Sequence, residues 1–85
     1  MAYNIHLTDT AKKQLAKLDG QIAKRIAKKL HEISDDPFPY VSKLIGVELY
    51  KLRVGDYRVL MNIQQNKLII IVIEISHRRN VYKQI

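Results

Sequence analysis

Hydrophobic residues in the first part of the chain recur at two different spacings. In the opening segment Tyr3, Ile5 and Leu7 alternate with polar residues, which predicts a short strand. After Thr8 and Asp9, whose side-chain oxygens can cap a helix, the spacing changes to steps of three and four residues. That spacing is typical of one apolar helical face. The apolar positions are Ala11, Leu15, Leu18, Ile22, Ile26, Leu30 and Ile33.

The helical pattern is interrupted at Asp19 and Gly20. Glycine readily takes a left-handed backbone conformation, and aspartate favours helix caps. We therefore predict two helices, over residues 9–18 and 20–34, that fold as a hairpin. The prolines of the following segment, DDPFPY, end the second helix because a residue that precedes proline disfavours helical geometry.

The remainder of the chain has the pattern of strands. VELYKLRV and YRVLMNIQ flank Gly55-Asp56, a two-residue hairpin signal, whereas YRVLMNIQ and KLIIIVIEIS flank the weaker signal Gln65-Asn66. The last strand is apolar on both faces, so we expect it to be central and covered on both sides. The sequence thus predicts one α+β domain over residues 1–85, with an N-terminal strand, a two-helix hairpin and a three-stranded antiparallel meander.

Composition narrows the class of function. The chain has 15 Lys and Arg residues against 8 Asp and Glu residues, a net charge of +7, which indicates polyanions as partners. It has no cysteine, and its three histidines lack a ligand spacing, so we expect no metal and no other cofactor. No apolar run is long enough for a membrane span and no signal-peptide pattern opens the chain, so we expect a cytoplasmic protein without membrane contact.

The positive charge is concentrated in the second half. Residues 1–42 carry 7 basic and 5 acidic residues, a balance of 7 − 5 = +2, whereas residues 43–85 carry 8 and 3, a balance of 8 − 3 = +5. We therefore look for a polyanion site among the predicted strands.

The first hairpin places several of these cations together. A two-residue turn puts Arg53 opposite Arg58, and alternation puts Lys51 on the same face of the sheet. Like charges directly opposite each other destabilise a sheet unless an anion lies over them. If the second turn also has two residues, Arg58 lies opposite Ile73 and His77 lies further along that face. The opposite face should pack under the helices with Tyr50, Leu52, Val54, Tyr57, Val59 and Met61.

Further cations follow the last strand. Arg78 and Arg79 would emerge near the hairpin, and Tyr82 follows three residues later. For any one of these residues a solubilising surface role is the simpler interpretation. For the whole set, we favour a site that binds or cuts a phosphate.

These motifs resemble the RelE/ParE superfamily of toxins from toxin–antitoxin pairs, over nearly the whole chain. The resemblance rests on the L-x-G of Leu44 and Gly46, on LYKLRVGDYRVL, and on HRRNVYK, which is close to the superfamily's H-R-x-x-V-Y ending. The specific parts are that ending and the pair Tyr57-Arg58. The resemblance implies a RelE-like fold with a sheet of the microbial-ribonuclease type.

By position, Arg58, Arg78 and Tyr82 match the arginines and tyrosine of the site in the ribosome-dependent RelE branch. Lys51 matches one of that branch's two paired lysines, and Leu49 stands where the other would be expected. The resemblance therefore implies a metal-independent endoribonuclease that cleaves mRNA on the ribosome, with the RNA 2′-OH attacking the neighbouring phosphorus.

Each residue of the set suits a task in that reaction. The fork of Arg58 can grip two phosphate oxygens and stabilise the phosphorane, and Arg78 can share this task or assist the leaving group. Tyr82 can stack on a base or transfer a proton, and Lys51, crowded by like charges, is a candidate for proton transfer. The residues expected to bind RNA are Lys43, Arg53, His77, Arg79 and Lys83; of these, His77 is also a candidate for proton transfer.

The resemblance further implies partners and two alternatives. The partners are the ribosome, its mRNA and an acidic antitoxin that forms a hetero-oligomer with this chain. One alternative is a ParE-like inhibitor of DNA gyrase, and the other is a non-catalytic nucleic-acid-binding module or corepressor. The presence of Arg58, Arg78 and Tyr82 favours the nuclease over both.

Overall fold

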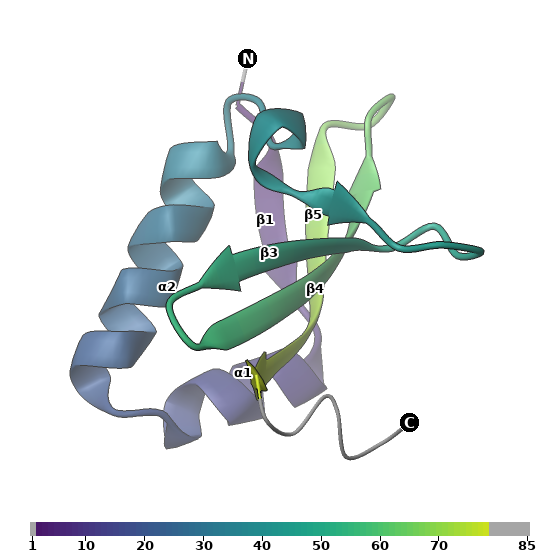
Figure 1. The fold of residues 1–85 in the computed structure, drawn as a ribbon. Coiled ribbons are helices and arrows are strands. Elements are labelled where there is room, and N and C mark those ends of the chain that lie inside the picture. Colours follow the sequence, from purple (N-terminus) through teal and green to yellow (C-terminus); the bar gives the residue numbers. More distant parts are fainter. Residues whose placement is uncertain (1, 79–85) are drawn as a thin grey trace.

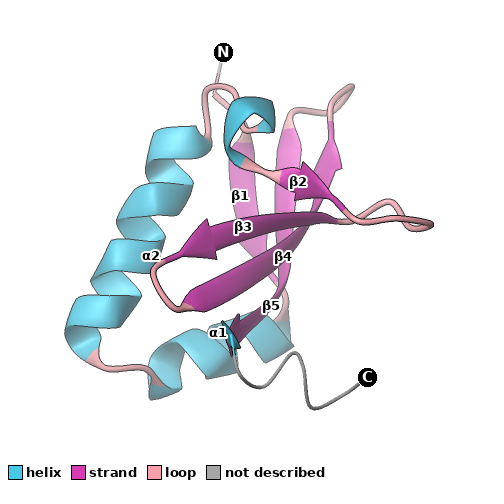
Figure 2. Ribbon diagram, viewed as in Figure 1, coloured by secondary structure: helices cyan, strands magenta, loops and turns pink. Residues whose placement is uncertain are grey.

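Two α-helices pack on one face of a five-stranded sheet in the computed structural model, which describes residues 2–78 (Figure 1). In Figure 2 one helix stands at the left of the strands and the other runs below them. In chain order, the elements are β1 (Asn4–Leu7), α1 (Asp9–Lys17), α2 (Gly20–Ile33), a 3-10 helix (Phe38–Tyr40), β2 (Ser42–Lys43), β3 (Tyr50–Val54), β4 (Tyr57–Gln64) and β5 (Ile69–His77). The α+β class is confirmed.

Both helices begin at a side-chain cap. Thr8 accepts a hydrogen bond from an N–H of the first turn of α1 at 3.1 Å, and Asp19 does the same for α2 at 2.9 Å. The predicted ranges 9–18 and 20–34 are correct to within one residue. Gly20 has no positive φ, so the Asp19 cap separates the helices without a left-handed glycine. Within residues 2–78, no helix is long and apolar enough to cross a membrane.

The two helices contact different parts of the sheet. α1 packs on β5 and α2 packs on β3, and Figure 1 shows the helix axes at a wide angle to each other. The sheet order is β1-β5-β4-β3-β2, with β1 parallel to β5 and all other pairs antiparallel. The meander β3-β4-β5 is therefore present as predicted. The short β2, which pairs at the outer edge of β3, was not predicted.

The second hairpin departs from its prediction in two ways. β4 ends at Gln64 and pairs there with Ile69, so the connection has four residues, 65–68, where two were expected. The same pair of strands contains a β-bulge. Met61 pairs with Val72, whereas Leu60, the residue before Met61 on β4, pairs with Glu74. The extra residue in the bulge is Ile73.

These departures change which side chains share a face. The longer loop shifts the β4–β5 register by two residues, which keeps the alternation, but the bulge adds one residue and reverses it. Arg58 therefore pairs with Ser76, and the predicted pairing with Ile73 is wrong. His77 pairs with Tyr57, which belongs to the face under the helices. The prediction that His77 shares the face of Arg58 is also wrong.

The core lies between the helices and one sheet face. Fully buried side chains from α2 meet those of β3, β4 and β5, and the members of this group include Ile26, Ile33, Leu52, Val59, Met61, Ile70 and Val72. As predicted, β5 is an interior strand, flanked by β1 and β4. Its other face carries Ile69, Ile71 and Ile73, which are only partly buried. The expected cover on both sides of this strand is wrong at these positions.

Candidate phosphate-binding site

The β3–β4 hairpin gathers three cations on its open face. Gly55 in the turn has φ +58°, a left-handed conformation that suits glycine. The register is as predicted, with Arg53 opposite Arg58 and Lys51 opposite Leu60. Because directly paired residues point to the same side of a sheet, all three cations lie on the side that the helices do not cover.

The two opposed arginines differ in their surroundings. Arg53 is exposed, and its Nε donates a hydrogen bond to the carbonyl of Gly55 at 3.3 Å. Arg58 and Lys51 are half-buried. An opposed pair of like charges costs about 0.2 to 1 kcal/mol. An anion bound over the pair would relieve that cost.

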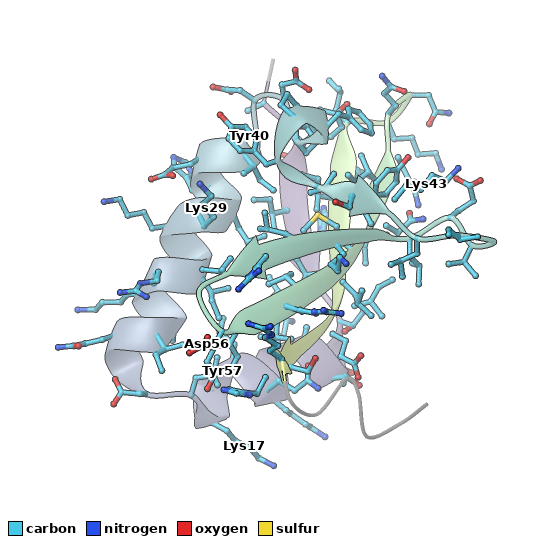
Figure 3. All side chains as sticks on the ribbon, viewed as in Figure 1. Lys17, Lys29, Tyr40, Lys43, Asp56 and Tyr57 are labelled. Carbon is cyan, nitrogen blue, oxygen red and sulfur yellow. The ribbon has the colours of Figure 1, made fainter. Side chains whose placement is uncertain are left out.

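Arg78 is anchored to the same hairpin. Its backbone N–H donates to the carbonyl of Asp56 at 2.7 Å, which ties the end of β5 to the β3–β4 turn. Asp56 lies two positions before Arg58, so the two arginines leave the backbone from neighbouring points. Figure 3 shows Asp56 and Tyr57 together at this end of the sheet. The backbone of Arg78 thus lies at the hairpin turn, and the role of its side chain in the site stays a prediction.

His77 occupies a different environment from the one predicted. Its ring stands edge-on to the ring of Tyr57, with centroids 5.1 Å apart and an interplanar angle of 84°. Both rings border a cavity of about 320 Å³ between α1 and the end of β5, which Gln14 and Lys17 also line. His77 therefore lies on the side of the sheet that the helices cover, and not on the open face that carries the cations.

The bulge brings two unpredicted residues into the rows of the open face. Ser76 pairs with Arg58, and Glu74 pairs with Leu60, which in turn pairs with Lys51. Glu74 thus places a carboxylate in the row of the lysine. The bulge sets these pairings, and both residues also line the cavity beside α1 that His77 borders.

The remaining predicted residues fall into two groups. Lys43 pairs with Tyr50 on the outer edge of the sheet and forms an ion pair with Glu48 at 3.3 Å. Figure 3 shows it far from Asp56 and Tyr57, so the structure does not bring it to the hairpin turn. The others, Arg79, Tyr82 and Lys83, lie outside the described residues, and their roles stay predictions.

The arrangement is suited to holding a phosphodiester. Guanidinium groups present several N–H donors in a planar fork that matches two oxygens of one phosphate. Arg58 on β4 and Arg78 directly after β5 carry such forks, and the hydrogen bond from the Arg78 N–H to the Asp56 carbonyl ties their segments together. Lys51 adds a point charge in the next row. The fold and the candidate site are those of a small basic α+β protein with a cationic sheet face that suits a phosphate.

Comparison with known proteins places the chain in a family. Residues 5–82 match the family described as ParE toxin of type II toxin–antitoxin system, parDE, and the chain belongs to this family of the RelE/ParE superfamily. The mRNA interferase toxin RelE of Escherichia coli K12 is 31% identical over 81 residues, which cover 92% of this chain and 85% of that protein. The mRNA interferase RelE of Shigella flexneri matches to the same extent.

A solved structure agrees with the fold. The archaeal RelE–RelB complex from Pyrococcus horikoshii OT3 contains a chain that superposes with a TM-score of 0.80 at 26% identity. The match covers 92% of this chain and 97% of that chain. The resemblance to the superfamily is therefore confirmed over most of the sequence.

Proposed function

We propose that this chain is the toxin of a RelBE-type toxin–antitoxin pair and that it cleaves mRNA on the ribosome. The observation that carries the proposal is the joint placement of Arg58 and Arg78, held by the hydrogen bond between Arg78 N–H and the Asp56 carbonyl. The RelE proteins that it resembles are named mRNA interferases, and this supports an endoribonuclease activity for this chain.

The reaction that we propose needs no metal. The 2′-oxygen of the RNA attacks the adjacent phosphorus and loses its proton, the bond from phosphorus to the 5′-oxygen breaks, and that oxygen takes up a proton. The products are a 2′,3′-cyclic phosphate and a 5′-hydroxyl. Arg58 and Arg78 would stabilise the charge that develops on the non-bridging oxygens, an effect typically worth 10²- to 10³-fold per donor.

Three residues are candidates for proton transfer in this reaction. Lys51 and Tyr82 are the candidates that the family resemblance supplies, and Glu74 is a third, because a carboxylate in the same row as Lys51 can accept the 2′-proton. The proposed site has strong groups for stabilising negative charge, but its groups for transferring a proton are weaker. A ribosome that holds mRNA in the reactive conformation would supply the missing orientation.

Two partners complete the proposal. Known RelE chains have been solved with RelB antitoxins, and we propose that an acidic antitoxin binds this chain and neutralises part of its +7 charge. Because the proposed substrate is mRNA on translating ribosomes, we propose that the protein acts in the cytoplasm.

Gyrase inhibition is the second candidate, because the matching family is described by its ParE member. The two functions are separated by one experiment on the purified protein. We expect cleavage of mRNA on programmed ribosomes, mapped by primer extension, and unchanged DNA supercoiling by gyrase in a parallel assay. Intact mRNA together with inhibited supercoiling would refute the nuclease and support the ParE-like function.

A further inference from the structure

A second basic surface lies on the other side of the hairpin turn. An open groove of about 350 Å³ runs between α2 and the end of β3, and its lining comprises Arg25, Lys28, Lys29, Glu32, Arg53, Val54 and Gly55. The groove borders the part of β3 beyond Lys51, where the pairing with β2 has already ended. α2 thus takes the place of a neighbouring strand along this edge.

The charges of the groove are only partly compensated. Glu32 forms an ion pair with Lys29 at 3.8 Å, and Lys29 also lies 5.2 Å from the ring centroid of Tyr40, a contact visible in Figure 3. Within residues 2–78, no carboxylate pairs with Arg25 or Lys28. These two residues are exposed and three positions apart on one helix, a spacing at which like charges destabilise the helix.

The groove is continuous with the phosphate-binding face. Arg53 lines the groove and is also the residue opposite Arg58 in the hairpin. On the helix side, Nη1 of Arg25 lies 3.5 Å from the point that a methyl group on Gly55 would occupy, so the guanidinium reaches the turn itself. Cations therefore lead from the open face, around the turn, to α2.

We propose that this groove binds the sugar–phosphate backbone of an RNA segment adjoining the one that is cut. The inference rests on the proposed function for the identity of the RNA. The chemistry of the surface requires a polyanion, since uncompensated cations at regular spacing gain affinity by releasing the counterions of phosphates. Its continuity with the cleavage site favours RNA over an acidic peptide. Arg25 and Lys28 then set affinity and do not take part in the chemistry.

The test compares two double variants of equal net charge. Arg25→Gln with Lys28→Gln removes the groove cations, whereas Lys12→Gln with Lys13→Gln removes two exposed cations of α1 that line no part of the groove. Both pairs lower the net charge from +7 to +5 and leave the core untouched. Melting temperature, measured on each variant, checks the fold.

The readouts are kcat and KM for cleavage on programmed ribosomes, and the affinity for a fluorescein-labelled RNA 20-mer by anisotropy, each at several salt concentrations. We expect the groove variant to raise KM and Kd about tenfold with kcat unchanged. The dependence of log affinity on log salt should become shallower by about 1.5, at roughly 0.7 to 0.9 per lost phosphate contact. The α1 variant should stay within about twofold of the parent in both assays.

Several outcomes would overturn the inference. One is an RNA affinity and salt dependence of the groove variant equal to those of the α1 variant. Another is unchanged RNA affinity with weakened binding of polyglutamate, which would assign the groove to an acidic protein. A parent protein that binds the 20-mer but cuts no mRNA would refute the proposed function alone, because the anisotropy comparison still decides the role of the groove.

Discussion

Replacing Arg58 by alanine separates the function of the open face from its stability. The change removes a guanidinium that lies directly opposite Arg53, so it relieves a repulsion of about 0.2 to 1 kcal/mol. Arg58 is half-buried, and the loss of its aliphatic stem acts in the opposite direction by a similar amount. The net change in unfolding free energy should therefore stay within about 1 kcal/mol, or roughly 5 °C in Tm for a domain of this size.

Activity should respond on a different scale. Loss of one donor to a developing oxyanion costs about 10²- to 10³-fold in kcat, which is about 2.7 to 4 kcal/mol. The assay is the single-turnover rate of mRNA cleavage on programmed ribosomes, with Tm measured on the same preparation.

Two matched variants sharpen this result. Arg53→Ala removes the same charge from the opposing, exposed position and should change kcat by less than about tenfold. Arg58→Lys keeps the charge of the parent but loses the planar fork, so it should recover only part of the rate. Unfolding of Arg58→Ala, or cleavage by it at the parental rate, would refute the assignment of this residue to the phosphate.

Three further predictions concern the residues that shape and complete the site. Gln14→Leu removes the side-chain oxygen that accepts a hydrogen bond from the N–H of Ile75 at 2.6 Å. It should lower the unfolding free energy, measured by urea titration, by about 1 to 3 kcal/mol. Gln14→Glu keeps an acceptor, so its unfolding free energy should fall by less. Gly55→Ala places a methyl group at φ +58° and should cost about 1 to 2 kcal/mol by the same measurement; an unchanged midpoint would contradict the left-handed turn. Tyr82→Ala should slow cleavage by about 10²-fold or more, and Tyr82→Phe then distinguishes the roles, since a near-parental rate indicates stacking and an equal loss indicates proton transfer.

The parts of the fold that the sequence predicts well depend on local signals. Each helix starts at a cap that is visible as a residue type, and the first hairpin follows from two turn residues that admit one register. That register alone places Lys51, Arg53 and Arg58 on one face, so the sequence predicts the centre of the candidate site.

The departures come from contacts between residues that are distant in sequence. The bulge at Ile73 is held where β1 ends, because Thr8 donates its hydroxyl hydrogen to the Ile73 carbonyl at 2.9 Å and Gln14 accepts from the N–H of Ile75. The run Ile69–Ile73 is apolar at every position, so alternation within it does not mark where the bulge falls. The pairing of His77 and Glu74 follows from the bulge beside these two hydrogen bonds, and alternation alone does not predict it.

The parallel pairing of β1 with β5 also determines when the protein can fold during its own synthesis. Thr8 and Ile73, which the sheet brings into hydrogen-bond contact, are 65 residues apart in the chain. Closing so long a loop costs conformational entropy before any contact repays it, and such non-local pairing slows folding. Until β5 has left the ribosomal tunnel, β1 has no neighbour, β4 lacks one of its two, and the Asp56 carbonyl lacks the N–H of Arg78. A nascent chain that has not reached this point therefore lacks the pairing of Arg58 with Ser76 and the hydrogen bond of Arg78, on which the proposed phosphate site depends.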